Sequence, residues 1–422
     1  MTTQWLIISY FAHIDAMAPS HHVDDRIPFF REKGVAVDLL SSPCGIPYGD
    51  LSHTRIPSPA PSGIRYEARY FLRRRTKKRF WFKFWETLLL LPVYPFYFVE
   101  KLLLRLDSTW SWFLTASLSA LVLAIRKRPA VIYSTGGPVS AHIAAMVASR
   151  ITKIPHIAEF QDPLVHQYAA PGKFERHFIE KVERAILRTA AASVFLTKKA
   201  AENAARRNPG IKNITCIYAG AVPPGAMPCG ERGPTLRIAH FGSLGGSRNL
   251  NSFFDALFML FREDPSLAGA LTLDLYGNNS REVSRRMEQF PLKGILAAKG
   301  KVKRQKALEA MSRADLLLLI QNTDDVSFET IPSKVYEYLH TGRPVLALVY
   351  RNRELQSMLE ESGHVVVQAD NAVEIAQGLK TCIARWRENA FPLPCTGTSS
   401  PYTVERAVGE LMRLAQSARR EE

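Results

Sequence analysis

The chain has 422 residues, enough for two domains with separate hydrophobic cores, and its 46% hydrophobic content is ordinary for a globular protein. The formal net charge of +16 is not ordinary. It indicates an acidic partner, such as an anionic lipid, a phosphorylated substrate or a nucleic acid. Because no DNA- or RNA-binding motif accompanies the charge, we predict no nucleic-acid partner.

Cysteine usage and the first residues narrow the class further. The five cysteines are odd in number, contain no Cys-x-x-Cys pair and lack a histidine cluster at zinc spacing. This pattern predicts reduced thiols and no metal site. The chain opens on a strand pattern without a basic stretch and long apolar signal segment, so we expect a cytoplasmic protein.

Alternating strand and helix patterns fill residues 1–222. Because helices separate consecutive strands, the sequence predicts a Rossmann-like domain with a parallel sheet over this range. The apolar strand patterns lie at 5–11, 35–40, 130–133, 156–160, 193–196 and 214–218, and the helical patterns lie before Gly34, at 139–150 and at 174–189.

A basic and aromatic segment interrupts this domain at about 61–110. Between 65 and 83 there are nine Lys or Arg residues and one acid, interleaved with aromatic side chains. Such a mixture suits an anionic membrane surface, so we predict a peripheral location on the inner face of the cell membrane. The candidate membrane residues are Arg73, Arg74, Arg75, Lys77, Lys78, Arg79, Trp81 and Trp85.

Two apolar runs follow the basic segment. The run at 88–99 is interrupted by Pro92 and Pro95, and it is shorter than the roughly 20 residues that span a bilayer. The run at 110–125 directly precedes a strand, where a Rossmann-like domain needs a core helix. We predict that core helix, with a short membrane hairpin over 88–125 as the alternative.

A Gly- and Pro-rich stretch separates the first domain from a second one. Residues 220–234 hold four Gly and four Pro, which predicts a linker at 223–234. Strand and helix patterns then resume over 235–398, which predicts a second Rossmann-like domain, and 399–422 is helical in pattern. The strands are expected at 237–241, 271–276, 316–320 and 345–349, with helices at 303–313 and 371–387.

Two glutamates eight residues apart, Glu329 and Glu337, lie between the last two of these strands. Pro332 suits the first turn of a helix, and Gly342 suits its C-cap, followed by Pro344, which prevents continuation. A helix N-terminus favours an anion such as phosphate. Carboxylates beside such a site would bind hydroxyl groups, and sugar hydroxyls next to a diphosphate meet that demand. The alternative is an amphipathic helix carrying two solvated acids.

This segment resembles the Glu-x7-Glu signature of retaining glycosyltransferases of the GT-B fold, family four in particular. Its local form, E-T-I-P-S-K-V-Y-E-Y-L, is similar to that of bacterial surface-polysaccharide and lipid-linked glycan enzymes. The resemblance implies two Rossmann-like domains whose parallel sheets face a central cleft. It further implies acceptor binding by the N-terminal domain, donor binding by the C-terminal domain, and a terminal helix at 399–422 that crosses back.

The same resemblance implies roles for individual residues around the signature. Glu329 would hydrogen-bond the donor sugar, and Glu337 would hold the ribose hydroxyls. Lys334 and the N–H of Ser333 would bind the diphosphate. The retaining mechanism implied is front-face, so no protein nucleophile is expected and the leaving phosphate accepts the acceptor's proton.

A glycine-rich loop follows the strand at 237–241. Its Gly-x-Leu-x-x-x-basic pattern resembles the family-four loop that contacts the donor diphosphate. The family usually has Arg directly after the glycine and Lys six residues after it, whereas this chain has Gly242 followed by Ser243 and Arg248. The alternative is a glycine-rich turn with a solvated arginine. No Asp-x-Asp occurs in the chain, so we expect neither a metal ion nor another cofactor.

Candidate acceptor residues lie in the first domain. The segment 158–163 resembles the D-F-R-D-P strand end of polysaccharide members of the family, which makes Asp162 a candidate to contact the acceptor or the reacting sugar. A turn aspartate before Pro163 is the alternative. Weaker acceptor candidates follow the first and third predicted strands, and the histidines among them also fit surface or packing roles: His13, His21, His22, Gly136 and Gly137.

Together these patterns predict a hexosyl or other glycosyl transferase that moves a sugar, with retention, from a nucleotide-diphosphate sugar to a membrane-associated glycan or lipid acceptor. Two alternatives stay open. One is a non-catalytic GT-B scaffold subunit of a membrane glycan-synthesis complex, which the Ser243 departure favours. The other is a GT-B sugar-nucleotide epimerase. The sequence leaves the oligomeric state, the donor sugar and the acceptor open.

Overall fold

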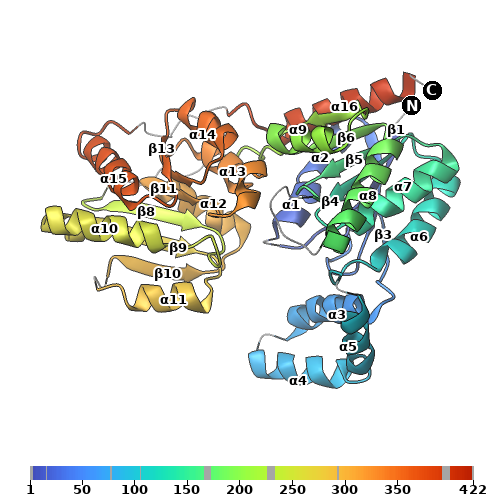
Figure 1. Cartoon of the computed structure of the whole chain (residues 1–422), viewed down its shortest axis with the longest axis horizontal. Helices are drawn as coiled ribbons and strands as arrows, with labels where there is room; N and C mark the ends of the chain where they lie inside the picture. The colour runs from blue at the N-terminus through green and yellow to red at the C-terminus, as the bar shows by residue number, and fades with distance from the viewer. Residues whose placement is uncertain are drawn as a thin grey trace. The chain divides into compact units, whose positions relative to one another are not determined.

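A computed structural model of the chain describes residues 3–15, 17–76, 78–104, 106–165, 173–225, 233–291, 294–391 and 400–420. These residues form two compact α/β units (Figure 1). The first unit contains the described residues up to Tyr218 together with the segment from Val404, and the second contains the described residues from Ala219 to Thr403. The predicted class, α/β with two parallel sheets, is confirmed.

The sheet of the first unit has seven parallel strands in the order β3-β2-β1-β4-β5-β6-β7. The order reverses between β1 and β4, where Trp5 pairs with Val131 and Ile8 with Ser134. Loops that leave the carboxyl ends of these two strands therefore meet at the position where open α/β sheets bind ligands. The strands are β1 (Thr3–Ile8), β2 (Val35–Ser41), β3 (Ser52–Arg55), β4 (Val131–Gly136), β5 (His156–Phe160), β6 (Ala192–Phe195) and β7 (Ile214–Cys216).

Helices cover both faces of this sheet, because neighbouring residues of each strand point to opposite sides. Trp5 and Ile7 pack with α1, α2 and α16, whereas Leu6 and Ile8 pack with α6 and α7. Helices α8 and α9 extend the second layer over β5 and β6. The bounds are α1 (Ala18–Asp24), α2 (Arg26–Glu32), α6 (Trp112–Lys127), α7 (Val139–Thr152), α8 (Lys173–Thr189), α9 (Lys198–Arg207) and α16 (Val404–Arg420).

Three further helices lie between β3 and α6: α3 (Pro61–Arg75), α4 (Arg79–Leu90) and α5 (Tyr94–Leu103). Both α4 and α5 pack on α3, and the three form a group apart from the two helix layers of the sheet (Figure 1). Within the described residues, no helix is long and apolar enough to cross a membrane. We call Pro61–Leu103 the helical insert.

Helix α6 corresponds to the predicted core helix at 110–125. Its buried face carries Trp112 and small residues spaced by four, which allow close packing against α7. Its opposite face is apolar but exposed at Leu114, Leu118, Val122 and Ile125. The core prediction therefore holds for one face of the helix only.

The sheet of the second unit has six parallel strands in the order β10-β9-β8-β11-β12-β13. Here the order reverses between β8 and β11, where Leu316 pairs with Ile238. The strands are β8 (Leu236–Phe241), β9 (Leu271–Tyr276), β10 (Leu296–Gly300), β11 (Leu316–Ile320), β12 (Val345–Val349) and β13 (Val365–Gln368).

The second sheet is also covered on both faces. Leu316, Leu318 and Ile320 of β11 pack with α10, α11 and α15 in one cluster. The alternate residues Leu317 and Leu319 are buried on the other side, where α12, α13 and α14 lie. The bounds are α10 (Asn251–Glu263), α11 (Arg281–Glu288), α12 (Arg304–Arg313), α13 (Lys334–Thr341), α14 (Arg353–Glu360) and α15 (Ala372–Arg387), with 3-10 turns η1 (Pro265–Gly269) and η2 (Asp325–Glu329).

Candidate active site

The glycine-rich loop after β8 lies against the start of α13. A Cβ added to Gly242, whose φ is +149°, would come within 3.3 Å of Lys334 Cε and 3.4 Å of its Nζ. Gly277, after β9, has φ +136°, and a Cβ there would lie 2.1 Å from the carbonyl oxygen of Gly242. Both positions therefore require glycine, for backbone conformation and for space. They bring the Lys334 side chain to the carboxyl end of β8.

Two cations share this position, and among the described residues no carboxylate is close enough to form an ion pair with either. Burial lowers the pKa of the Lys334 ammonium; Glu337 raises it, and the nearby Arg248 guanidinium lowers it again. Burial also lowers the pKa of Arg248, whose Nε is buried and unpaired among the described residues. Like charges held together away from water are unfavourable unless an anion joins them. The pair thus has the electrostatic character of a phosphate site.

His240, the penultimate residue of β8, completes the floor of this site. Its Nδ1 lies 2.9 Å from the carbonyl oxygen of Leu318, so Nδ1 carries the proton and donates. Its Nε2 is then an acceptor, buried and unpaired within the described chain, 3.4 Å from the position of a Gly242 Cβ. Burial lowers the pKa of His240 to about 4, so the ring is neutral at pH 7.

Hydrogen bonds join the glycine-rich loop to the segment after β11. Ser247 Oγ donates to Asp324 Oδ2 at 2.6 Å, and the hydroxyl of Thr323 donates to the Ser247 carbonyl at 3.0 Å. Asp324 also attracts the Arg248 guanidinium. The two loops at the β8–β11 reversal therefore form one structure, with Arg248 held at its edge.

Glu329 ends the η2 turn and is buried, with 2% of its surface exposed. Two side-chain amides hold the backbone around it. Gln321 Nε2 donates to the carbonyls of Ser327 and Thr330 at 2.8 and 3.2 Å, and Asn352 Nδ2 donates to the same two carbonyls at 2.6 and 3.0 Å. Its burial means that Glu329 is not a solvated acid, as the alternative interpretation of the sequence required.

Helix α13 begins at Lys334, so Pro332 precedes the helix instead of lying in its first turn. Glu337 consequently lies in the first turn, closer to the N-terminus than a helix with Pro332 in its first turn would place it. Its carboxylate accepts a hydrogen bond from Arg304 Nε at 3.1 Å and forms an ion pair with that guanidinium. Gly342 caps the helix in the left-handed conformation, with φ +66°, as predicted. Ser333, the N-cap residue, and Ser243 are both exposed.

All of the predicted donor residues thus lie at the carboxyl edge of the second sheet. Sequence reasoning missed four residues that shape the same edge: His240, Arg304, Gln321 and Asn352. A histidine inside an apolar strand was a visible signal for the first. The other three act through tertiary contacts that no local pattern reports.

In the first unit, Asp162 and Gly137 lie close together at the carboxyl ends of β5 and β4. A Cβ on Gly137 would come within 3.5 Å of Asp162 Oδ2, and the Asp162 side chain is exposed. The neighbouring Gln161 amide donates to the hydroxyl of Thr135 at 3.2 Å. The predicted pair is therefore brought together at the reversal point of its own sheet.

The three histidines predicted as acceptor candidates differ in how far stacking and hydrogen bonds within the first unit already engage them. His13 stacks on Tyr48, with ring centroids 4.2 Å apart, and its backbone N–H donates to Asp24 Oδ1 at 2.8 Å. His22 Nε2 lies 2.8 Å from Glu159 Oε2, beneath the sheet edge. His21 lies half-buried on α1. The packing alternative therefore accounts for His13 and His22.

The carboxylate that holds His22 belongs to a buried ionic cluster. Glu159 is fully buried and also accepts hydrogen bonds from Arg26, Tyr133 and Thr135. Despite the opposing effect of burial, Arg26 and His22 hold the pKa of Glu159 well below its usual range. Removing one partner of such a buried pair is strongly destabilising, so this cluster fixes the floor of the first unit's ligand edge.

Gly136 is connected to a chain of buried hydrogen bonds. His142 Nε2 lies 3.3 Å from the Gly136 carbonyl and donates to it, so His142 Nδ1 accepts from Ser134 Oγ at 2.8 Å. Ser134 Oγ in turn accepts from His156 Nε2 at 2.7 Å. The chain requires a neutral His142, because its Nδ1 must accept, whereas protonation of His156 would place an unpaired N–H at its buried Nδ1, which has no partner among the described residues.

Acid should break this chain. Burial lowers the pKa of His142 to about 4 and that of His156 to about 3, so the unfolded chain, near pKa 6.5, binds more protons than the folded one between these values. The contribution of these histidines to the free energy of unfolding is therefore complete above pH 6.5. It decreases as the pH drops toward 4, by on the order of 3 kcal/mol for His142. Thermal unfolding at pH 7.5 and 4.5 measures this slope. His142→Gln should unfold earlier at pH 7.5 but lose part of the slope; an unchanged slope would contradict the assignment.

The predicted membrane residues lie at the α3–α4 junction. Arg73, Arg74 and Arg75 end α3, and Trp81 and Trp85 are exposed on α4. Lys78 is the N-cap of α4 and is exposed. Lys77 lies outside the described residues, and so does the side chain of Arg79. One residue departs from the prediction: the Arg74 guanidinium donates to the carbonyls of Pro43 and Gly45 at 3.0 and 2.9 Å, and so has a structural role.

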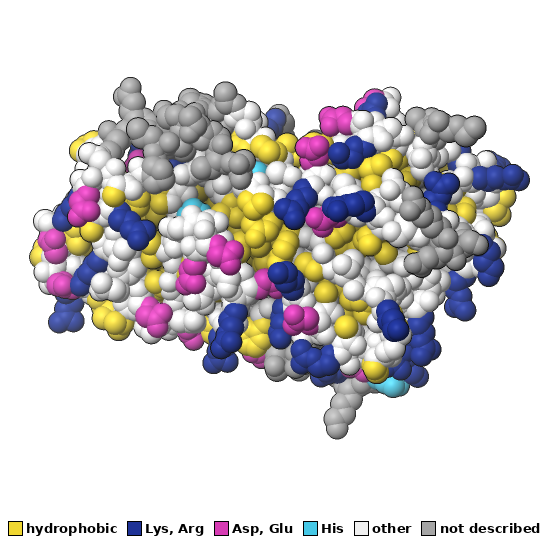
Figure 2. All heavy atoms as spheres, turned by 90° about the horizontal axis from the view of Figure 1, so that it is seen from above, with side chains coloured by type: hydrophobic (Ala, Val, Ile, Leu, Met, Phe, Trp, Pro, Cys, Tyr) yellow, Lys and Arg dark blue, Asp and Glu magenta, His cyan; other side chains and the backbone are white. Residues whose placement is uncertain are grey.

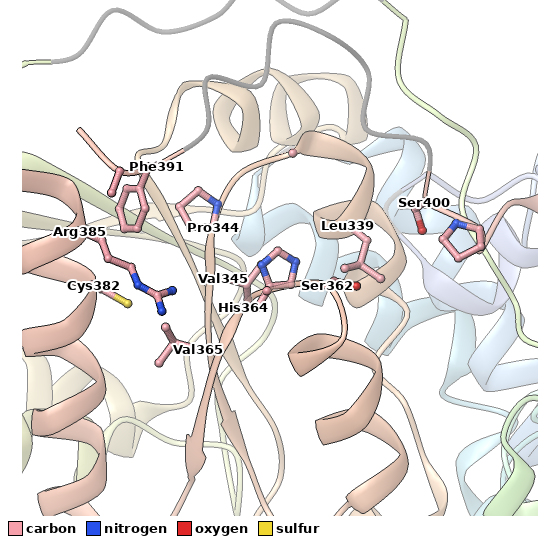
Figure 3. Close-up of a pocket in the computed structure, with 14 residues that line it drawn as sticks. Leu339, Pro344, Val345, Ser362, His364, Val365, Cys382, Arg385, Phe391 and Ser400 are labelled. Atoms are coloured by element: carbon pink, nitrogen blue, oxygen red, sulfur yellow. The ribbon is translucent and has the colours of Figure 1, made fainter. Parts of the chain in front are cut away.

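A separate cavity of about 370 Å³ opens at the amino ends of β12 and β13, on the opposite edge of the second sheet from Lys334 (Figure 3). Its lining includes His364, Arg385, Cys382 and Phe391. It contains none of the predicted donor residues, so its size does not make it the donor site. Figure 2 shows lysine and arginine side chains spread across the face that it draws, and those described there do not gather into a single patch.

The chain is similar to a known protein family in sequence and to several solved structures in fold. Residues 30–220 match the family model described as the Glycosyl transferase 4-like domain. Anabaena HepE in complex with UDP and glucose has a TM-score of 0.63 at 13% identity, over 98% of this chain and 100% of that one. The lipopolysaccharide outer core galactosyltransferase WaaB has a TM-score of 0.60 at 10% identity, over 98% and 99%. No curated protein sequence matches the chain.

The paired sheets and the loops at their reversal points define a protein of the GT-B fold. The same fold also includes a structure from Listeria monocytogenes named as a candidate UDP-N-acetylglucosamine 2-epimerase, with a TM-score of 0.58 at 10% identity, over 100% and 98%. The first unit therefore carries a match to the Glycosyl transferase 4-like domain, and the described chain has the GT-B fold that HepE and WaaB also have.

Proposed function

We propose that the protein transfers a sugar, with retention, from a nucleotide-diphosphate sugar to a glycan or lipid acceptor at a membrane. The observation that carries the donor half is the cation pair beside Gly242, Lys334 and Arg248, neither of which forms an ion pair with a described carboxylate. A diphosphate supplies the anion that this pair lacks, and cationic donors stabilise it best as it leaves. HepE, the similar protein crystallised with UDP, favours a uridine diphosphate sugar as the first donor to test.

The second unit's residues divide the donor between them. Lys334, Arg248 and the N-terminal turn of α13, which Ser333 caps, hold the diphosphate. Glu337, oriented by Arg304, accepts from the ribose hydroxyls, and Glu329 accepts from hydroxyls of the sugar. The bond from the sugar's anomeric carbon to phosphate oxygen breaks as the acceptor oxygen bonds to that carbon. The acceptor's proton passes to the leaving phosphate, so no protein nucleophile takes part.

The acceptor half belongs to the first unit in this proposal. Asp162 is exposed beside Gly137 at the carboxyl edge of the sheet, where a hydroxyl acceptor could be held by its carboxylate. A membrane-borne acceptor fits the basic and aromatic insert on the same unit. We propose a peripheral location on an anionic membrane surface for this reason, with a polysaccharide or lipid-linked glycan as the product class.

Nucleotide binding without a metal ion is the first test. UDP and UDP-sugars should raise the melting temperature equally in EDTA and in magnesium, because fixed cations neutralise the diphosphate; at a ligand concentration of about 100 Kd the stabilisation is roughly 2.7 kcal/mol. GDP-, dTDP- and CMP-sugars serve as comparisons. Absence of a shift with every nucleotide would favour the scaffold alternative, and a shift only with magnesium would contradict the metal-free site.

Product analysis separates transfer from epimerisation. A glycosyltransferase incubated with the stabilising nucleotide sugar and an acceptor extract should release the nucleoside diphosphate in step with glycosylated acceptor. An epimerase would instead change the sugar's configuration with the nucleotide still attached and no acceptor present. Detection of that epimer would overturn the proposal.

A further inference from the structure

The outer surface of the helical insert is apolar to an extent unusual for a water-soluble surface. On α4, two rows of residues spaced by four point outward, and the third row, Phe82, Glu86 and Leu90, faces α3 or is buried. Several side chains exceed half exposure, including Leu102 at 81%, Phe80 at 72% and Phe96 at 66%. The exposed set on α4 and α5 is Phe80, Trp81, Phe84, Trp85, Leu88, Leu89, Leu91, Phe96, Phe98, Val99, Leu102 and Leu103. We call it the apolar face.

Much of the insert's own charge is used internally. Arg65 and Arg69 pair with Glu86 at 3.9 and 3.0 Å, which joins α3 to α4. Glu100 is buried and accepts from Ser62 N and Trp110 Nε1 at 2.8 and 2.7 Å, which joins α5 to its neighbours. Both acids are thereby withdrawn from the surface. The groups left at the margin are apolar side chains and basic ones.

Two further arginines, Arg73 and Arg75, lie over aromatic rings near the α3–α4 junction. The guanidinium of Arg75 is 4.2 Å from the Phe71 ring centroid, and that of Arg73 is 5.6 Å from Phe82. Lys78 and Lys83 are exposed nearby. An apolar surface rimmed by cations is complementary to the acyl region of a leaflet and to its anionic headgroups together. A protein partner would require acids that face this rim, whereas a leaflet supplies both parts.

The insert is also fastened to the loop that follows β1. Tyr10 Oη donates to Glu67 Oε1 of α3 at 3.0 Å. Arg74 and Arg55 both donate to the carbonyls of Pro43 and Gly45, and Gly45 lies so close to Ala12 that an added Cβ would be 1.8 Å from its carbonyl oxygen. Through these contacts α3 fixes the position of the β1 loop relative to the apolar face.

We propose that the apolar face is a single-leaflet anchor, which inserts its aromatic and leucine side chains into an anionic bilayer and sets the β1 loop at a fixed height above the lipid. This goes beyond electrostatic attraction of a basic patch, because the inserting residues are apolar. The anchor itself is independent of the chemistry. Only the meaning of the loop's height, access to a lipid-borne acceptor, rests on the proposed function.

Flotation of the full chain with phosphatidylcholine vesicles containing about 30% phosphatidylglycerol tests the anchor. The protein should float at about 0.1 M and at about 1 M salt, since insertion is not screened. Phe96→Ser/Phe98→Ser/Leu102→Ser should lower the partition coefficient roughly 100-fold at both salt concentrations. Arg73→Ser/Lys78→Ser/Lys83→Ser should lower it only at the lower one. The matched control, Phe258→Ser/Met259→Ser/Val373→Ser, changes exposed apolar residues of the second unit and should float normally.

Tryptophan fluorescence measures how deeply the apolar face inserts into the bilayer. Trp81 and Trp85 are exposed, whereas Trp5, Trp112 and Trp386 are buried. Vesicles should shift the emission to the blue and brominated lipid should quench it, and both effects should fall sharply in Trp81→Phe/Trp85→Phe, in which the half-buried Trp110 remains. The anchor would be overturned if the wild type failed to float at one or both of the two salt concentrations. Normal flotation of the Phe96→Ser/Phe98→Ser/Leu102→Ser variant would also overturn it. So would a wild-type protein that sediments as a dimer while this variant sediments as a monomer, because the apolar face would then bind a second copy of the chain.

Transfer assays with two forms of the acceptor distinguish the membrane anchor from the proposed glycosyltransferase function. The Phe96 triple variant should retain transfer to an acceptor dispersed in detergent but lose at least about tenfold with the same acceptor in vesicles, because only the second assay needs the anchor. If nucleotides fail to bind while flotation behaves as expected, the proposed function fails and the anchor stands. Equal losses in both assays would overturn the anchor's role in acceptor access.

Discussion

Replacement of Lys334 by methionine is expected to lower the turnover of sugar transfer roughly 100-fold or more, the usual cost of removing one donor to a developing anionic charge. The ammonium lies beside Gly242 with Arg248 close by, and no described residue pairs with it. In the ligand-free protein its removal relieves repulsion between two half-buried cations. The variant should therefore unfold at the same temperature as the wild type or above it, while losing most of the stabilisation by UDP.

This combination distinguishes a ligand-binding lysine from a structural one. Lys306→Met removes an exposed lysine from α12 of the same unit and should leave both turnover and nucleotide stabilisation unchanged. Isothermal calorimetry with UDP, together with transfer rates, measures the effect. A Lys334→Met protein that melts early but transfers sugar normally would show that the lysine supports the fold and that the diphosphate binds elsewhere.

Sequence patterns predicted the sheets well where strands are buried on both faces. The strands His156–Phe160, Leu271–Tyr276, Leu316–Ile320 and Val345–Val349 have the predicted bounds. The last two are continuous apolar runs between turn residues, and Leu271–Tyr276 alternates apolar and polar residues, so these three patterns are distinctive. Three edge strands were missed. S-H-T-R of β3 and L-A-A-K-G of β10 carry neither long apolar runs nor alternation, whereas V-V-V-Q of β13 (Val365–Gln368) is apolar but only four residues long. The helix predicted to end near Gly34 is divided into α1 and α2 at Asp25.

The candidate site was predictable to the extent that its residues directly follow strands. Gly242, Arg248 and Lys334 lie together at one sheet edge because parallel strands present their carboxyl ends together. What holds them was not predictable. Asn352 has a local signal, since it caps α14 by accepting from Leu355 N, but its bonds to the Glu329 loop join residues more than 20 positions apart.

In the insert, the composition predicted a membrane-contacting segment but not which side chains lie outermost. Basic residues were expected to make the contact together with Trp81 and Trp85. The fold instead uses Arg74 to hold backbone carbonyls and places Arg73 and Arg75 over rings, which leaves the apolar residues outermost. Helix geometry decides which side of a mixed segment faces outward, and two prolines obscured that periodicity in the sequence.

Glu329→Gln should lower kcat/KM for transfer by roughly 10- to 150-fold, the equivalent of one lost charge-assisted hydrogen bond of about 1.5–3 kcal/mol. The amide keeps the shape of a side chain that is 2% exposed, whereas alanine would leave a cavity and confuse the outcome with misfolding. The backbone on both sides stays fixed, because Gln321 and Asn352 bind the carbonyls of Ser327 and Thr330 and not the carboxylate.

The assignment of Glu329 to the sugar makes a sharper prediction than lost activity. Stabilisation by UDP, which has no sugar ring, should be the same in Glu329→Gln and in the wild type, while the additional stabilisation by the UDP-sugar should disappear. Asp325→Asn, an exposed carboxylate on the same turn, is the matched control and should behave as the wild type in both measurements. If Glu329→Gln loses UDP binding as well, the carboxylate serves the nucleotide pocket. Normal transfer by the variant would exclude it from the donor site, and the two glutamates would then be no more than acids at the ends of a turn and a helix.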